Sequence, residues 1–230
     1  MSKILKKNRN KAGALTLAST QVKFKFDEET HNPTDVSYYS MFDTNSMVEE
    51  FMLLANISVS MKILQHFPGK SILRHHVPPK PVMIKEFSNL MDSLGYNLDY
   101  SSSKQLATSL DSIVRKDDDF FNRLVRIMTT RCMNEAAYIC SGDYDYPEYH
   151  HYGLATPLYT HFTSPIRRYA DVLVHRLLAA SIDIDSLPGS MCNKHYLSKL
   201  CDNMNMRHRN ARFASRASSD YFAYLFFKVR

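Results

Sequence analysis

The segment from Ser164 to Leu178 constrains the fold more than any other part of the sequence, because it joins a helix-start signal to a regular apolar stripe. A serine at the N-cap can accept a hydrogen bond from a free backbone N–H, and Pro165 suits the first helical position because it has no N–H. The sequence therefore predicts a helix from Ser164 to about Leu178. Its buried face would consist of apolar residues at three- and four-residue steps, namely Ile166, Ala170, Leu173, Val174 and Leu177.

Two consecutive arginines, Arg167 and Arg168, fall in the first turn of this predicted helix, where the helix dipole disfavours positive charge. The free N–H groups of a helix N-terminus can bind a phosphate, and a guanidinium can add a bidentate pair of charge-assisted hydrogen bonds. One interpretation is therefore a phosphate-binding site. The other is an ordinary ion pair between these arginines and Asp171, on a solvated face of the helix.

Composition narrows the class of protein. The chain has 230 residues, 44% of them hydrophobic, which is enough for one core or at most two. Its net charge of +6 favours an anionic partner without identifying one. The four cysteines form no Cys-x-x-Cys pair, and there is neither a signal peptide nor an apolar run of roughly 18 residues. We therefore expect an intracellular protein with reduced thiols and no membrane partner.

Hydrophobic periodicity and the glycine and proline breaks predict a fold of the α+β class, predominantly helical, with a small β-hairpin near the N-terminus. Strands at residues 15–17 and 22–26, joined by residues 18–20, would form the hairpin. Residues 31–43 and 71–81 are predicted to be loops. The other predicted helices cover residues 2–12, 46–67, 83–94, 103–114, 120–140 and 193–227.

For two of these helices, the sequence indicates which residues face the core. In the helix 46–67, Glu49 and Asn56 are seven positions apart and share one face, beside an apolar face that includes Met47, Phe51 and Leu54. Glu49 and Asn56 are either ligand contacts, or a capping residue and a satisfied core amide. For the final helix, the predicted core residues are Leu197, Leu200, Met204, Ala211, Ala214, Tyr221 and Phe222.

The eleven residues Tyr159–Tyr169 (YTHFTSPIRRY), followed by Asp171 and by the sequence HRLL at residues 175–178, resemble the signature of the ribonuclease II (RNB) family of 3'-to-5' exoribonucleases. Residues Thr44–Asn56 are similar to the branch of that family that serves the eukaryotic RNA exosome. The resemblance extends from about residue 3 to the C-terminus.

This resemblance implies hydrolysis of single-stranded RNA to nucleoside 5'-monophosphates in RNA processing and decay, including that of ribosomal RNA. It also implies the RNA exosome core as a protein partner, no DNA substrate, and a location in the nucleus, the cytoplasm or both. Arg167 matches the family's catalytic arginine, which stabilises charge on the scissile phosphate. The residues that would bind RNA or shape its site are Arg168, Glu49, Asn56, Tyr159, His161, Thr163 and Ser164.

The family's reaction uses Mg²⁺ held by a cluster of aspartates, in an Asp-Ile-Asp-Asp-like segment that does not occur in this sequence. We therefore expect residues 1–230 to be the C-terminal portion of an RNB catalytic domain. The aspartate cluster, the cold-shock domains and the S1 domain would lie outside this sequence. The chain by itself would hold no metal and be inactive. The alternative is a non-catalytic RNA-binding or scaffold fragment.

Overall fold

The computed structural model describes residues 1–17, 23–29, 31–37 and 42–228. Helices dominate this part of the chain, and the strands form two small antiparallel sheets, so the predicted α+β, predominantly helical class is confirmed. The helices are α1 (Ser2–Ala12), α2 (Asp43–His66), α3 (Pro81–Ser93), α4 (Ser103–Ser112), α5 (Phe121–Cys132), α6 (Tyr169–Ser181) and α7 (Lys194–Lys228). The strands are β1 (Lys23–Phe26), β2 (Pro33–Ser37), β3 (Ile72–His75) and β4 (Ala137–Cys140).

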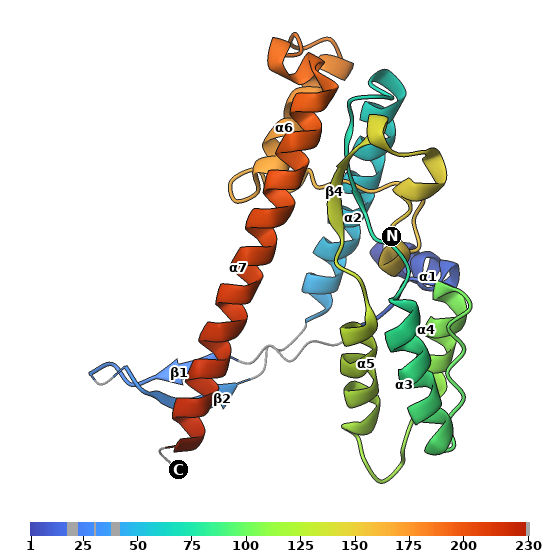
Figure 1. Cartoon of the computed structure of the whole chain (residues 1–230), viewed down its shortest axis with the longest axis vertical. Coiled ribbons are helices and arrows are strands. Elements are labelled where there is room, and N and C mark those ends of the chain that lie inside the picture. The colour runs from blue at the N-terminus through green and yellow to red at the C-terminus, as the bar shows by residue number, and fades with distance from the viewer. Residues whose placement is uncertain (18–22, 30, 38–41, 229–230) are drawn as a thin grey trace.

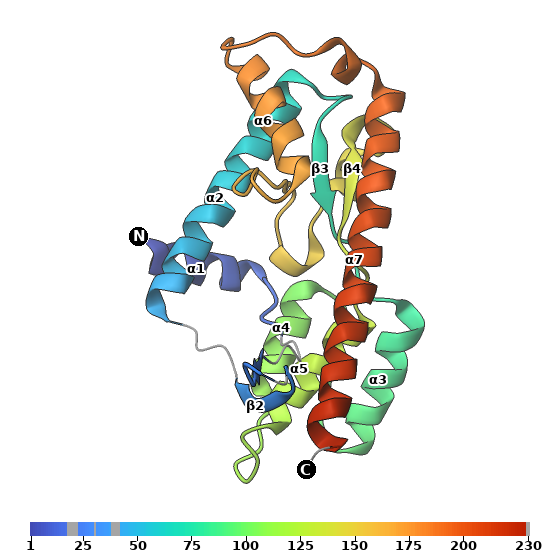
Figure 2. The same cartoon turned by 90° about the vertical axis from the view of Figure 1, so that its left-hand side faces the viewer.

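The upper half of the molecule in Figures 1 and 2 is built around the two-stranded antiparallel sheet of β3 and β4, with α2, α6 and the first part of α7 packed around it. In this sheet Arg74 lies opposite Tyr138 and His75 lies opposite Ala137. A core of aliphatic side chains joins the sheet to the three helices, with Ile63, Ile72, Val174, Leu177 and Leu197 fully buried.

The lower half has a second core, formed mainly by α3, α4 and α5. Helix α4 begins where the Ser102 side chain accepts a hydrogen bond from the Gln105 N–H at 3.2 Å. Helix α1 reaches this half through Gly13, which ends the helix with a φ of 100°. A Cβ at Gly13 would lie 2.7 Å from the backbone of Lys104. Both the left-handed φ and this close approach require glycine.

The prediction that residues 15–17 and 22–26 pair as a hairpin is wrong. β1 pairs with β2, and Lys25 lies opposite Asp35, with an ion pair of 3.0 Å between them. The segment 33–37, predicted to be a loop, is thus a strand. Leu15 instead joins the lower core, and its N–H donates to the Gly153 carbonyl at 2.9 Å. The predicted connection at residues 18–20 lies outside the described residues.

Two other element predictions also need correction. The long helix predicted at residues 120–140 stops at Cys132, because Met133 is extended with a ψ of 148°, and residues 137–140 form β4. Part of the loop predicted at residues 71–81 is its partner β3. Strand pairing and burial of Ile72 and Ile139 override the local helical pattern here.

The extents of α1, α3, α4 and α7 agree with the prediction, but the buried face of α7 does not. Leu197 and Cys201 are buried near its start and Phe226 near its end. Between them, residues 206–220 are exposed, so Ala211 and Ala214 are not core residues. The apolar residues Met47, Phe51 and Leu54 of α2 are likewise more than one-third exposed. None of the described helices is long and apolar enough to cross a membrane.

A nearly buried ion pair fastens α1 to α2. Both Nε and Nη2 of Arg9 donate to the Glu50 carboxylate, the shortest contact being 2.5 Å, and the Glu50 side chain is only 3% exposed. Replacing Arg9 by Met would leave this carboxylate buried without its partner, which costs about 3 kcal/mol. We therefore expect Arg9→Met to lower the free energy of unfolding by about that amount, measured by urea denaturation.

The matched control is Lys7→Met, because Lys7 is an exposed cation on the same helix. It should change the free energy of unfolding by less than about 0.5 kcal/mol. Equal effects of the two substitutions would contradict the importance of the Arg9–Glu50 pair.

Candidate functional site

The carboxylate of Asp171, in the first turn of α6, is the most constrained group in the region of the two arginines. Asp171 is fully buried, and it accepts two hydrogen bonds from Arg168, at 2.7 Å from Nε and 2.8 Å from Nη2. It also accepts a hydrogen bond from the Ser164 N–H at 2.7 Å. A negative charge is favoured at a helix N-terminus, so Asp171 stabilises both the start of α6 and the segment before it.

Residues 164–168 form a separate turn in front of α6. The N–H groups of Arg167 and Arg168 both donate to the Ser164 carbonyl, at 3.2 and 3.1 Å. The helix itself begins at Tyr169, with Arg168 at its N-cap. The prediction of a helix starting at Ser164–Pro165 is therefore wrong. The N-cap position belongs to Arg168 and not to Ser164, whose backbone N–H donates to the Asp171 carboxylate of α6.

The two arginines consequently have different environments. Arg168 makes the ion pair with Asp171 that the second interpretation of the sequence described. Arg167 is exposed at the tip of the turn, beside Ile166, which is 96% exposed. Within the described part of the chain, no carboxylate pairs with Arg167. The turn thus exposes the Arg167 guanidinium, while Asp171 holds the Arg168 guanidinium in place.

Asn56 connects α2 to the segment before this turn. Its amide group donates to the Tyr159 hydroxyl at 3.0 Å and accepts from the Phe162 N–H at 2.9 Å. Both Asn56 and Tyr159 are buried, and the ring of Phe162 stacks on His175 of α6 at 4.3 Å between centroids. As a satisfied buried amide, Asn56 positions the loop, and its direct contact with RNA stays a prediction.

His161 contacts Tyr138, which sequence reasoning did not assign to the site. Its Nδ1 is 2.7 Å from the hydroxyl of Tyr138 in β4, and its ring also packs edge-on against Tyr159. Burial, followed by the positive charges of Arg74, Arg168 and Arg167, lowers the pKa of His161 to about 2. His161 is therefore neutral and can act as a hydrogen-bond donor or acceptor near neutral pH.

Arg74 of β3 was also missed. Its guanidinium lies 4.7 Å from the centre of the Tyr138 ring, and the backbone N–H of Arg74 donates to the Tyr159 carbonyl at 2.8 Å. Asn205 of α7 bonds to the Tyr138 N–H and carbonyl, both at 2.8 Å, so three elements hold this tyrosine. No local pattern indicates these contacts, because periodicity predicts a loop at residues 71–81 and a helix at residues 120–140.

The remaining predicted residues are Thr163 and Glu49. Among the described residues, the buried Thr163 hydroxyl has no hydrogen-bond partner. Glu49 is 46% exposed on α2 and lies 3.8 Å from Arg9. It is seven positions before Asn56, or about two helical turns, so it does not join the cluster around Asp171.

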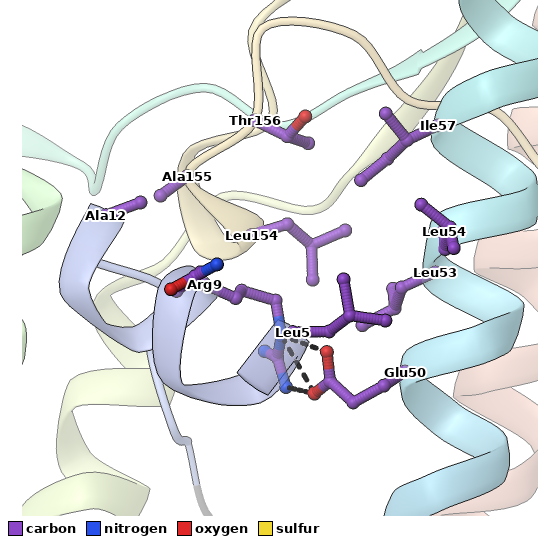
Figure 3. Close-up of a pocket in the computed structure, with 11 residues that line it drawn as sticks. Leu5, Arg9, Ala12, Glu50, Leu53, Leu54, Ile57, Leu154, Ala155 and Thr156 are labelled. Atoms are coloured by element: carbon purple, nitrogen blue, oxygen red, sulfur yellow. Dashed lines mark hydrogen bonds and ion pairs between the residues drawn. The ribbon is translucent and has the colours of Figure 1, made fainter. Parts of the chain in front are cut away.

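A cavity of about 250 Å³ lies between α1, α2 and residues 154–156 (Figure 3). Its lining is mostly aliphatic, and Leu5, Leu54 and Leu154 point into it. The only ion pair drawn at its edge joins Arg9 to Glu50, so these charges compensate each other. This cavity is therefore a poorer site for an anion than the exposed turn that carries Arg167.

No group of three or more His, Cys, Asp or Glu side chains within the described ranges is arranged to hold a metal ion. The acidic loop after β4 instead makes structural contacts. Asp143 pairs with Lys194 at 2.9 Å and accepts a hydrogen bond from Ser198. Glu148 accepts from the Asp145 N–H at 3.0 Å. These residues do not fit a catalytic Mg²⁺ site.

Replacing Asp171 by Asn would preserve the shape of the side chain and remove its charge. Arg168 and the Ser164 N–H would lose charge-assisted hydrogen bonds, each worth about 1.5 to 3 kcal/mol. We expect Asp171→Asn to lower the free energy of unfolding by about 2 kcal/mol, measured by denaturant titration. Asp92→Asn, at an exposed position of α3, is the control. An unchanged unfolding midpoint in Asp171→Asn would contradict this role.

Comparison with known proteins places this geometry in a family. Residues 1–183 match the RNB domain. The chain is 52% identical over 230 residues to exosome complex exonuclease RRP44 homolog A of Arabidopsis thaliana, and 49% identical over 231 residues to exosome complex exonuclease RRP44 of Homo sapiens. These alignments cover 100% of this chain but 24% of each relative, so the chain spans about a quarter of their length.

Two solved structures share the fold. Mycoplasma genitalium RNase R in complex with ribose methylated single-stranded RNA matches 98% of this chain and 34% of that one, with a TM-score of 0.80 at 24% identity. Yeast Ssd1, a pseudonuclease, matches 70% of this chain and 20% of that one, with a TM-score of 0.61 at 31% identity. By its RNB-domain match and its similarity to exosome exonucleases, the chain belongs to the RNB domain family.

Proposed function

We propose that this chain is part of a 3'-to-5' exoribonuclease that hydrolyses single-stranded RNA to nucleoside 5'-monophosphates in RNA processing and decay. In this proposal Arg167 is the catalytic arginine that stabilises negative charge on the scissile phosphate. The observation that carries it is the free guanidinium of Arg167, presented by a turn that the buried Asp171 fixes. A preorganised cation stabilises a developing anion without reorganising during the reaction.

The neighbouring residues would hold the RNA or shape its site. Arg168 adds positive charge beside Arg167, although Asp171 compensates part of it. Tyr159, His161, Thr163 and Ser164 shape the loop that presents the arginines, and Asn56 anchors that loop. The exposed carboxylate of Glu49 is proposed to contact an RNA ribose further along α2.

We expect the reaction to require Mg²⁺ bound by carboxylates elsewhere in the complete protein, since the described residues of this chain do not fit that ion. Residues 1–230 would then form the C-terminal portion of the RNB catalytic domain. By similarity to exosome exonucleases, the RNA exosome core is the proposed partner, and the nucleus, the cytoplasm or both the proposed location.

A second candidate function is non-catalytic RNA binding or scaffolding. It is favoured by one observation, the 31% identity over 70% of the chain to yeast Ssd1, a pseudonuclease. The two candidates differ in whether the complete protein releases mononucleotides from single-stranded RNA when Mg²⁺ is supplied. RNA binding without any Mg²⁺-dependent release would support the second candidate.

The catalytic proposal is tested by substituting Arg167 in the complete protein that contains this chain. Loss of one preorganised charge-stabilising group costs about 100-fold to 1000-fold in rate. We expect Arg167→Ala to reduce kcat by that factor, measured as Mg²⁺-dependent release of nucleoside 5'-monophosphates. Arg131→Ala is the control, because Arg131 is an exposed arginine of α5. Wild-type kcat in Arg167→Ala would refute the assignment.

A further inference from the structure

Arg74 is the third arginine of the site, and it is half-buried on β3. Its guanidinium lies over the ring of Tyr138, the residue opposite it in the β3–β4 sheet. The Tyr138 hydroxyl is in turn 2.7 Å from Nδ1 of His161 in the loop before the turn. These contacts place the Arg74 side chain beside the loop that carries Arg167 and Arg168.

Among the residues that the structure describes, none supplies an acidic partner for the charge of Arg74. Asp171 pairs with Arg168, and Glu135, on the segment before β4, pairs with Arg212 of α7 at 2.9 Å. Within the described ranges, no carboxylate lies within ion-pair distance of Arg74. Burial accordingly lowers the pKa of Arg74, and repulsion from Arg168 lowers it further. A half-buried guanidinium in this situation favours an anionic partner that is not part of this chain.

The guanidinium groups of three arginines affect the pKa of the His161 imidazole. The pKa of His161 is lowered by Arg74, Arg168 and Arg167 together, after the larger effect of burial. Across the described part of the chain, only the Asp171 carboxylate pairs with any of the three. The cluster therefore has an excess of positive charge, which suits a segment of phosphate backbone better than a neutral ligand.

We propose that Arg74 binds a backbone phosphate of single-stranded RNA, next to the phosphate bound by Arg167. This proposal rests on the proposed function, because it assigns Arg74 to the same RNA strand. Tyr138 would orient the guanidinium by stacking beneath it, which leaves the N–H donors at its edge for phosphate oxygens. Arg74 is thus an RNA-binding residue of the site, and Tyr138 is its positioning residue.

The test is the salt dependence of RNA binding by the complete protein, measured with a single-stranded RNA oligonucleotide in the presence of a chelator, which prevents Mg²⁺-dependent cleavage. Each phosphate contact to single-stranded nucleic acid contributes about 0.7 to the slope of log affinity against log salt. We expect Arg74→Gln to reduce the magnitude of this slope by about 0.7 and Arg74→Lys to retain it. Arg131→Ala is the control for loss of a remote surface charge.

A structural role alone predicts a different result. Arg74→Gln and Tyr138→Phe would then both lower the thermal midpoint, while the salt slope of each stayed at the wild-type value. That outcome overturns the Arg74 proposal and leaves the proposed function intact. If the wild-type protein does not bind single-stranded RNA at all, the proposed function fails, and the Arg74 proposal fails with it.

A second measurement does not depend on the folding of a variant. Phenylglyoxal modifies accessible arginines, and mass spectrometry locates the modified sites in the wild-type protein. We expect RNA to protect Arg74 from modification and to leave Arg131 unprotected. Equal modification of Arg74 with and without bound RNA would overturn the proposal.

Discussion

The buried carboxylate of Asp171 determines the local structure on which the site depends. It accepts hydrogen bonds from the Arg168 side chain and from the Ser164 N–H at the same time. These bonds connect the turn at residues 164–168 to the start of α6. A buried carboxylate is costly unless its oxygens are bonded, and these contacts satisfy them. Asp171 pairs with Arg168, whereas Arg167 is exposed and has no carboxylate partner among the described residues.

The β3–β4 sheet supplies the second support of the site. Residues distant in sequence meet there, since Arg74 and Tyr138 are opposite each other and Tyr138 reaches His161. Helix α7 is fastened to the same point by Asn205, which bonds both backbone groups of Tyr138. The loop that carries the arginines therefore rests on rigid elements, as a preorganised binding site requires.

Sequence reasoning predicted the family, the fold class and most of the helices, because apolar periodicity and a contiguous signature are local features. It failed where long-range contacts decide the outcome. Ser-Pro is a good start signal and predicts a helix from Ser164, but α6 begins at Tyr169 and the Ser164 N–H donates to the Asp171 carboxylate. Arg74 and Tyr138 could not be predicted, because only the pairing of β3 with β4 brings them together.

The most direct test is a structure of the complete protein bound to single-stranded RNA. The expected result is a phosphate oxygen within hydrogen-bond distance, about 3 Å, of the Arg167 guanidinium, with the bond between Arg168 and Asp171 intact. The contradictory result is an Arg167 side chain directed into solvent with no phosphate near it, while RNA is bound elsewhere on the protein.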